Sequence, residues 1–256
     1  MDIPISGIII AVALLLVPIL IIVRFKIPIA EQAMTAVVRV AIQLTLITAY
    51  IFYLYEWNSP WANLLWLVAM AAVTTYALTT RSGLRKMPML IPVGVGVLVS
   101  ALVVGLLVLW PVMHLSHPFE TRFFLPVMAM LLAAMLSTNV AGLRAYYHTA
   151  HDQQEQYYYL LGNGASRTEA LTPFIREAFV QTFKPQLATL SALGVVTLPL
   201  LLTALLLGGC SPLEAAKLVL AITCATLCAS SLALLITLFV SNHFLIDKHN
   251  RLKNVF

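Results

Sequence analysis

Charged residues are scarce in this chain. Of its 256 residues, 10% are charged and 61% are hydrophobic, and the mean hydropathy is +0.94. Soluble domains have about a quarter of their residues charged, so this sequence cannot build a water-facing shell. In lipid every backbone polar group must be paired within the protein, which leaves helices or a closed barrel as spanning structures. The composition therefore predicts an integral membrane protein.

Other absences exclude whole functional classes. The three cysteines, Cys210, Cys224 and Cys228, are too few and too apolar in setting for a disulfide framework. The 15 basic residues lie at the ends of apolar runs and form no patch for nucleic acid. Neither a G-x-x-x-x-G-K-[ST] loop nor an H-E-x-x-H motif occurs. We therefore expect no enzymatic activity, no cofactor and no capacity to hydrolyse ATP alone.

What the sequence does contain is a series of apolar runs of about 20 residues, the length of a transmembrane helix. The predicted fold is all-α: a polytopic membrane protein with about seven transmembrane helices. The first run follows Asp2 without a positive n-region, so we expect a retained helix and no cleaved signal peptide. The predicted spans are Ile5–Val23, Val37–Tyr55, Trp61–Thr80, Ile91–Trp110, Phe123–Leu143, Pro185–Leu207 and Ala215–Ser241.

The distribution of basic residues predicts the orientation. With the N-terminus outside, only Arg122 and Lys217 face outward, and the C-terminus is cytoplasmic. The opposite orientation places most basic residues on the wrong side of the membrane. The predicted inner residues are Arg24, Lys26, Arg81, Arg85, Lys86, Arg144, Arg167, Arg176, Lys184, Lys248, Arg251 and Lys253.

The only long connection, residues 144–184, lies on the predicted cytoplasmic side. Its first part has polar residues at helical density and is expected to extend the fifth span. Gly162 and Gly164 then break the helix. Ser166 and Glu169 have the spacing of a capping box, in which each side chain satisfies an unpaired amide of a new helix. The sequence therefore predicts a helical turn and a fresh helix start in this segment.

The new helix is amphipathic. Thr172 and Pro173 predict its division into two short pieces, because threonine can cap a helix that has proline at its first position. The product would be a rigid elbow on the inner membrane surface. Two interpretations stay open: packing between two spans, or docking of a soluble partner. The apolar stripe consists of Leu171, Phe174, Ile175, Ala178, Phe179 and Phe183.

Several short elements occur in chain order with ungapped spacing. They are Arg39, Gln43 and Leu44; Gly164, Ala165, Ser166, Glu169, Ala170 and Arg176; Pro185; and Gly194, Leu198, Pro199, Gly209, Pro212, Ala215 and Lys217. Through them, the chain resembles the FetB-type ABC transporter permease family. That family is typified by a bacterial iron exporter and includes plant aluminium-tolerance half-transporters as distant relatives.

The resemblance implies a single permease domain over residues 1–256 in the bacterial inner membrane, with 144–184 as its cytoplasmic coupling segment. It implies an exporter built as a homodimer and energised by a separate cytoplasmic ABC ATPase subunit. The residues implied to couple to that ATPase are Gly164, Ala165, Ser166, Glu169, Ala170 and Arg176.

The membrane part departs from the family pattern. The family has Leu-Pro-Gly-Met-Met-x-Gly in the sixth span, whereas this chain has plain apolar residues through Leu198–Ala204. The family's Gly-Asn-x-Met in the fifth span is replaced by Ala133–Leu136. Because a metal ion needs donor atoms along its path, we expect inefficient movement of free iron. An organic or amphiphilic substrate is at least as well supported as a metal ion.

A few polar residues within the spans are candidates for a translocation path. Arg39 and Gln43 lie one helical turn apart, where an arginine must snorkel to headgroups or find a partner. For the threonines, bonding back to their own helix is the alternative role. The candidate path residues are Arg39, Gln43, Asn139, Thr197, Pro199 and Thr203.

Two histidine-containing groups recur at helical spacing and could bind a transition metal. A solvated polar face is the commoner meaning of such spacing, so no metal site is expected. Cys224 and Cys228 belong to a strip of small residues with Ala221, Ala225 and Ala229, for which close helix packing is the expected role. The histidine-containing groups are His148, His151, Asp152 and Glu155, and His114, His117 and Glu120.

A self-sufficient secondary carrier or channel is the alternative function. Ion-coupled carriers normally need intramembrane carboxylates or histidines, and the predicted spans contain none. Many carriers also consist of inverted halves, which an odd number of spans and one large inner loop do not favour. The sequence thus favours the ATP-driven permease.

Overall fold

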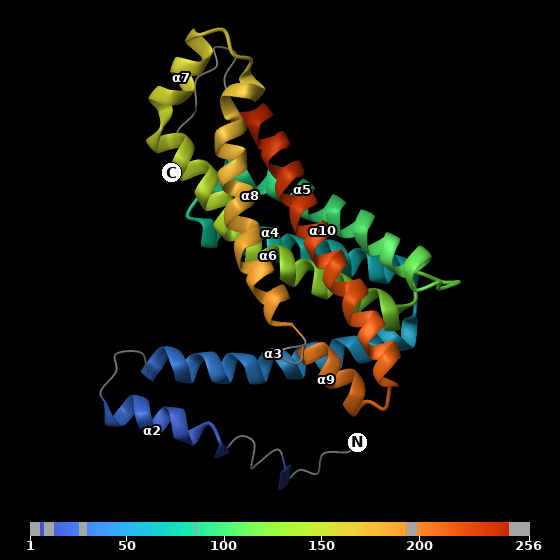
Figure 1. The fold of residues 1–256 in the computed structure, drawn as a ribbon. Helices are drawn as coiled ribbons and strands as arrows, with labels where there is room; N and C mark the ends of the chain where they lie inside the picture. The colour runs from blue at the N-terminus through green and yellow to red at the C-terminus, as the bar shows by residue number, and fades with distance from the viewer. Residues whose placement is uncertain (1–5, 8–12, 26–29, 85, 194–198, 246–256) are drawn as a thin grey trace. The chain divides into compact units, whose positions relative to one another are not determined.

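The computed structural model describes residues 6–7, 13–25, 30–84, 86–193 and 199–245, and all regular elements in these ranges are helices (Figure 1). The predicted all-α fold is confirmed. The helices are α2 (Leu16–Arg24), α3 (Ala30–Trp57), α4 (Pro60–Ser82), α5 (Lys86–Leu107), the π-helix η1 (Val108–Val112), α6 (Thr121–Asp152), α7 (Gln154–Gly162), α8 (Arg167–Ala192), α9 (Leu200–Leu207) and α10 (Pro212–Leu245).

Five helices in the described parts are long and apolar enough to cross a membrane. They match the predicted second, third, fourth, fifth and seventh spans, and the protein is a multi-pass membrane protein. The predicted first and sixth spans fall partly on residues outside the described ranges, so the number of seven and the orientation stay predictions. The five segments are Thr35–Trp57, Pro60–Ser82, Met89–Val112, Thr121–Asp152 and Pro212–Asn242.

The chain forms two compact units, Met1–Trp57 and Asn58–Phe256. In the first unit, α2 contacts α3, and the predicted path residues Arg39 and Gln43 are both exposed on α3. Threonines of α3 donate to carbonyls one turn earlier, as Thr45 does to Ala41 at 3.0 Å. This back-bonding satisfies hydroxyls inside an apolar helix.

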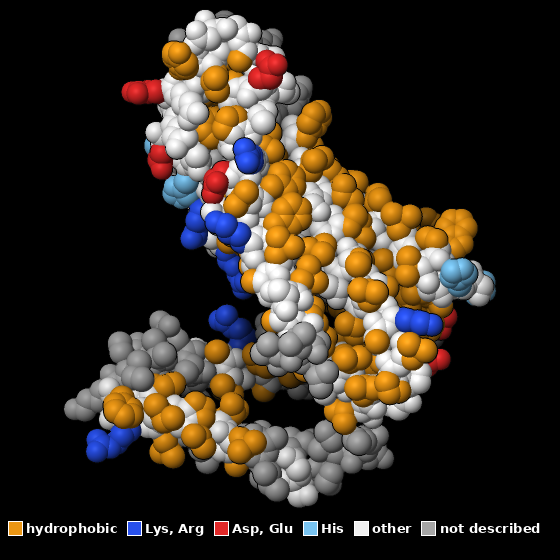
Figure 2. All heavy atoms as spheres, viewed as in Figure 1, with side chains coloured by type: hydrophobic (Ala, Val, Ile, Leu, Met, Phe, Trp, Pro, Cys, Tyr) orange, Lys and Arg blue, Asp and Glu red, His pale blue; other side chains and the backbone are white. Residues whose placement is uncertain are grey.

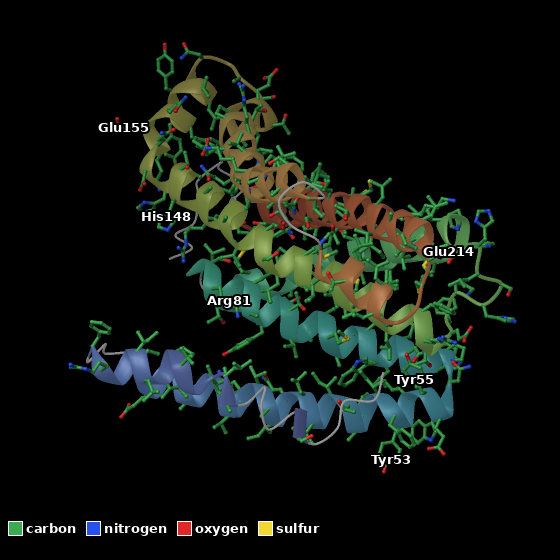
Figure 3. The ribbon with its side chains drawn as sticks, turned by 60° about the horizontal axis from the view of Figure 1, so that its bottom comes forward. Tyr53, Tyr55, Arg81, His148, Glu155 and Glu214 are labelled. Carbon is green, nitrogen blue, oxygen red and sulfur yellow. The ribbon has the colours of Figure 1, made fainter. Side chains whose placement is uncertain are left out.

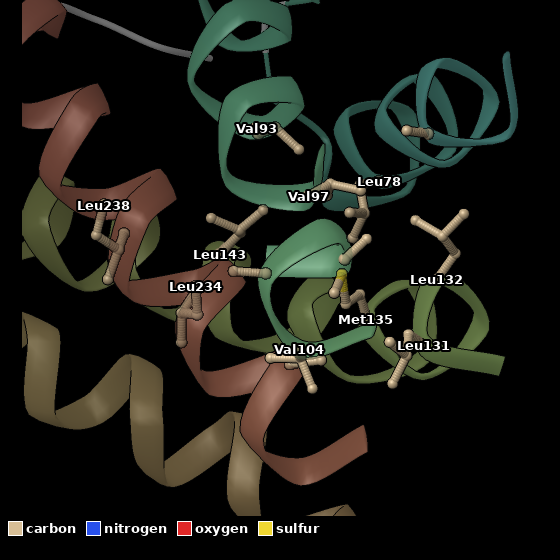
Figure 4. Packing of buried hydrophobic residues seen from close by; sticks show 14 of the residues in the cluster. Leu78, Val93, Val97, Val104, Leu131, Leu132, Met135, Leu143, Leu234 and Leu238 are labelled. Carbon is tan, nitrogen blue, oxygen red and sulfur yellow. The ribbon is translucent and has the colours of Figure 1, made fainter. Parts of the chain in front are cut away.

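The second unit is a helical bundle. In it α5 packs along α10, and α6 packs against both α4 and α8. Apolar side chains from these helices interdigitate in the core, among them Val97, Leu131, Met135 and Leu234 (Figure 4). The flank of α10 seen in Figure 2 is covered by hydrophobic side chains, as expected for a surface that faces lipid.

Two glycines allow helices of the bundle to approach closely. A Cβ atom on Gly96 of α5 would lie 2.7 Å from the carbonyl oxygen of Ala233 on α10. On Gly142 of α6 it would overlap Thr182 Oγ1 on α8. Small residues of this kind let transmembrane helices pack backbone against backbone. Ala225 and Ala229 are buried on α10, whereas Cys224 and Cys228 are exposed. The packing role predicted for the small-residue strip therefore holds for these two alanines and not for the cysteines.

Candidate functional site: a capped hairpin and a cavity joined by one helix

The hairpin tip, residues 162–166, connects α7 to α8 through a Schellman turn. The Ala165 N–H donates to the carbonyl of Leu160 at 3.1 Å, and the Gly164 N–H donates to that of Leu161 at 3.1 Å. Gly164 has φ +86°, in the left-handed region that favours glycine. The predicted break at the two glycines is confirmed, and its cause is the C-terminal cap of α7.

The start of α8 carries the predicted capping box. The backbone N–H of Ser166 donates to Glu169 Oε2 at 2.7 Å, and the Glu169 N–H donates to Ser166 Oγ at 3.3 Å. The Ser166 hydroxyl also donates to Glu169 Oε2 at 2.7 Å. These bonds to Ser166 lower the pKa of Glu169, because they stabilise its carboxylate. The exposed tip therefore has a fixed geometry and a fixed negative charge.

α8 then runs without interruption from Arg167 to Ala192, so the predicted division at Pro173 is wrong. The Thr172 hydroxyl does not cap a second helix; it donates to the carbonyl of Thr168 at 2.8 Å. Leu171 and Phe174, on either side of the proline, are fully buried in the core. Their packing offsets the hydrogen bond that proline removes. Pro185, predicted to begin the sixth span, also lies inside α8.

The implied coupling residues are distributed around the first turns of α8. Ser166, Glu169 and Arg176 are exposed and Ala165 is half-buried. Ala170 is fully buried, as is Tyr157 of α7, the helix that packs on α8. The exposed members are available to a partner, and Ala170 is a packing residue.

Hydrogen bonds attach both α6 and the first residue of α8 to the end of α10. Tyr146 donates to Asn242 Oδ1 at 2.6 Å, the hydroxyls of Tyr147 and Ser241 are hydrogen-bonded, and Arg167 donates to the Asn242 carbonyl. Sequence reasoning did not single out this cluster. The sequence features that could have indicated it are the adjacent Tyr146 and Tyr147 after the predicted fifth span, and the polar Ser241 and Asn242 at the end of the predicted seventh span.

A cavity of about 300 Å³ lies among α6, α8 and α10, in the part of the bundle formed by the membrane-crossing helices. Pockets that hold small molecules begin at about this size. Its wall on α8 begins at Pro185, so one continuous helix extends from the capped tip to the cavity. The lining residues are Ala134, Ser137, Thr138, Pro185, Gln186, Thr189, Leu190, Leu193, Thr223, Thr226 and Leu227.

Of the predicted path residues, the structure places one beside this cavity. Asn139 is buried, and its Oδ1 lies 3.3 Å from Oγ1 of Thr138, a lining residue. Thr203 lies on α9 and donates to the carbonyl of Pro199 at 3.2 Å, so its back-bonding role is confirmed. Thr197 lies outside the described residues. Gln186, with the lining serine and threonines, was missed by sequence reasoning.

Within the described ranges, no three His, Cys, Asp or Glu side chains gather as metal ligands. α6 ends at Asp152, and Gln153, with φ −111°, interrupts the helix before α7. His148 and Glu155 therefore belong to different helices at the same end of the bundle (Figure 3). The group at His114 lies in an irregular loop. The single helix face predicted for His148, His151, Asp152 and Glu155 is therefore interrupted at Gln153.

Fold and site together define an all-helical, multi-pass membrane protein with a projecting capped hairpin and a cavity among its membrane helices. Residues 5–245 match the profile of the uncharacterised protein family UPF0014, and the chain belongs to this family. It is similar to the UPF0014 membrane protein YjkA of Bacillus subtilis, with 21% identity over 229 residues that cover 90% of each chain.

A plant protein is also similar. Protein ALUMINUM SENSITIVE 3 of Arabidopsis thaliana is 27% identical over 101 residues, which cover 40% of this chain and 37% of the plant protein. The resemblance to this family of membrane proteins, seen first in short motifs, is thereby confirmed. No solved structure matches the chain.

Proposed function

We propose that the chain is the transmembrane permease subunit of an ABC transporter, with a separate cytoplasmic ATPase docking on the hairpin tip. The observation that carries this proposal is the continuity of α8. Its 26 residues extend about 39 Å at 1.5 Å per residue, and the first about 28 Å separate the capping box from the start of the cavity wall at Pro185. A displacement of the tip therefore moves the wall of the cavity.

The tip has the properties of a docking element. Its two ends are capped, so it loses little conformational freedom on binding. Glu169 and Arg176 are exposed on the first turns of α8, where opposite charges on a partner can orient the contact. The cluster formed by Tyr146, Tyr147, Ser241 and Asn242 fixes the base of the hairpin. A rigid projection on a fixed base transmits force, whereas a flexible loop would absorb it.

The lining of the cavity supports this proposal over a self-sufficient carrier. None of the described lining residues is ionisable, whereas proton- or ion-coupled carriers use intramembrane carboxylates or histidines. This lining is consistent with an energy source outside the chain. We further propose, from the family resemblance, an exporter in a bacterial inner membrane that functions as a homodimer with the hairpin on the cytoplasmic side.

The test is purification of the full-length permease from its native membrane, with any co-purifying ABC ATPase identified and quantified by mass spectrometry. Glu169→Arg reverses the charge of the tip and should reduce the recovered ATPase at least about tenfold, as loss of a charged interface contact does. Glu155→Arg is the matched control, because Glu155 is also exposed but lies on α7. Glu169→Gln keeps an acceptor for the capping box and separates charge from helix structure. Full ATPase recovery with Glu169→Arg would contradict the proposal.

A further inference from the structure

The hydroxyl groups around the cavity already donate their protons to hydrogen bonds within their own helices. Each of five lining hydroxyls donates to a backbone carbonyl three or four residues earlier in its own helix, at 2.6–2.9 Å. A hydroxyl has one proton and two lone pairs. The five residues are therefore hydrogen-bond acceptors toward the cavity: Ser137, Thr138, Thr189, Thr223 and Thr226.

Gln186 adds to this excess of acceptors. Its Oε1 is buried and receives no hydrogen bond from the described residues. An unpaired buried carbonyl costs free energy that a ligand donor can recover. Among the described lining residues, its amide nitrogen is the only side-chain group that can still donate, so the cavity offers many acceptors and almost no donors.

The absence of charged side chains from the described cavity lining also limits which ligands can bind. The described lining contains no lysine, arginine, histidine or carboxylate. A buried ion without a counter-charge is far more costly than a buried neutral group. An anion would find acceptor lone pairs and apolar surface but no counter-charge, and a small bare metal ion would find no anionic ligand. Ala134, Leu190 and Leu227 supply apolar surface for a carbon skeleton.

We infer that this cavity binds a neutral organic molecule that carries several hydroxyl or amide N–H donors, and that it discriminates against anions. The inference deepens the proposed function, since it names the class of substrate that the permease moves. Binding itself can be measured on the permease alone, without an ATPase.

The test compares three ligands of one ring and size: a neutral methyl hexoside, its 6-carboxylate and its 6-ammonium derivative. Their binding to the full-length permease in nanodiscs is measured by equilibrium dialysis. The neutral hexoside should bind at least about tenfold more tightly than the carboxylate. The carboxylate would give up its hydrating water molecules without gaining hydrogen-bond donors or a counter-charge in the cavity. Failure of the neutral ligand to bind better than the carboxylate overturns the inference.

Two sets of variants connect binding to this cavity. Thr223→Val with Thr226→Val removes two acceptors at nearly constant volume and should weaken hexoside binding about tenfold. Thr74→Val is the matched control: this threonine of α4 is buried and donates to its own helix at 2.8 Å, but lies outside the cavity. Equal affinities in the control and the double variant would contradict the assignment.

Gln186→Glu provides a readout that misfolding cannot imitate. A carboxylate in the wall supplies the missing counter-charge, so the variant should bind the ammonium derivative more tightly and the carboxylate derivative more weakly. An unchanged order of the three ligands would count against the cavity as the binding site. Because ATPase association is measured separately, failure of the unmutated permease to associate with an ATPase, with hexoside binding intact, would reject the proposed function and leave this inference standing.

Discussion

Replacement of Gly142 by alanine should loosen the contact between α6 and α8 and thereby displace the helix that joins tip and cavity. The new Cβ would overlap Thr182 Oγ1 and lie 3.0 Å from the Ala178 carbonyl oxygen. Contacts shorter than 3.0 Å essentially do not occur for Cβ atoms, so the Thr182 hydroxyl must move away. Overpacking of this kind in a tight core costs about 1–3 kcal/mol.

Gly94→Ala is the matched control. Gly94 also lies in a membrane helix, but its Cβ would have Thr75 Cγ2 as nearest neighbour at 3.6 Å, which is ordinary van der Waals contact. Alanine is the better helix former, so this variant should be neutral or slightly stabilised. The free energy of unfolding of both variants can be measured by denaturant titration in mixed micelles.

Thr182→Ala in the Gly142→Ala background should restore part of the lost stability. It removes the closest contact, whereas the Ala178 carbonyl stays 3.0 Å away. The Thr182 hydroxyl makes no hydrogen bond with the described residues, so its removal leaves no partner unsatisfied. If Gly142→Ala is as stable as Gly94→Ala, the close seating of α8 on α6 is refuted.

Three further outcomes are expected. A reporter after Phe256 should be cytoplasmic and Asn58→Cys should label from outside; external labelling of Ser166→Cys would reverse the topology. Because the folded-state pKa of Glu169 is lowered, its stabilisation of the helix start is present above the unfolded pKa of about 4.3 and lost as pH falls through the folded value. As the pH falls through that value, amide hydrogen exchange in the first turn of α8 should accelerate relative to exchange in α10. An unchanged ratio of the two exchange rates would show that the Glu169 carboxylate does not stabilise the helix start. Purified permease with its ATPase should move iron poorly in vesicles, and robust ATP-dependent iron efflux would restore a metal substrate.

Sequence alone predicts those features that depend on neighbouring residues. The capping box depends on Ser166 and Glu169, three positions apart, and the helix break depends on the conformational freedom of Gly164. Both features can therefore be predicted from local sequence. The five apolar helices follow from their length and composition. These local features position the hairpin tip.

Features that depend on distant partners were not predictable. Pro173 reads as a helix boundary, and only the burial of Leu171 and Phe174 explains why α8 continues. In the sequence, Gln186 is a single polar residue after a proline. Its place in the cavity wall depends on the packing of α6, α8 and α10, which local sequence does not indicate. Asn63 likewise lies in an apolar run, and its amide donates to the Phe119 carbonyl at 2.8 Å, which joins the starts of α4 and α6.

The central claim is that α8 transmits movement from the tip to the cavity. The most direct measurement is the rate at which a membrane-impermeant thiol reagent modifies Thr189→Cys in the permease–ATPase complex, with and without trapped ATP. Val180 and Gln181 lie between the tip and the cavity wall, and a glycine pair there weakens the helix by about 1 kcal/mol per residue relative to an alanine pair. The background lacks the exposed native cysteines Cys210, Cys224 and Cys228.

With alanine at 180 and 181, trapped ATP should change the modification rate at position 189 several-fold. With glycine at both positions, the ATPase should still bind but the change in rate should disappear, because the weakened helix no longer transmits the displacement. An equal ATP-dependent change in the two variants would contradict transmission through α8.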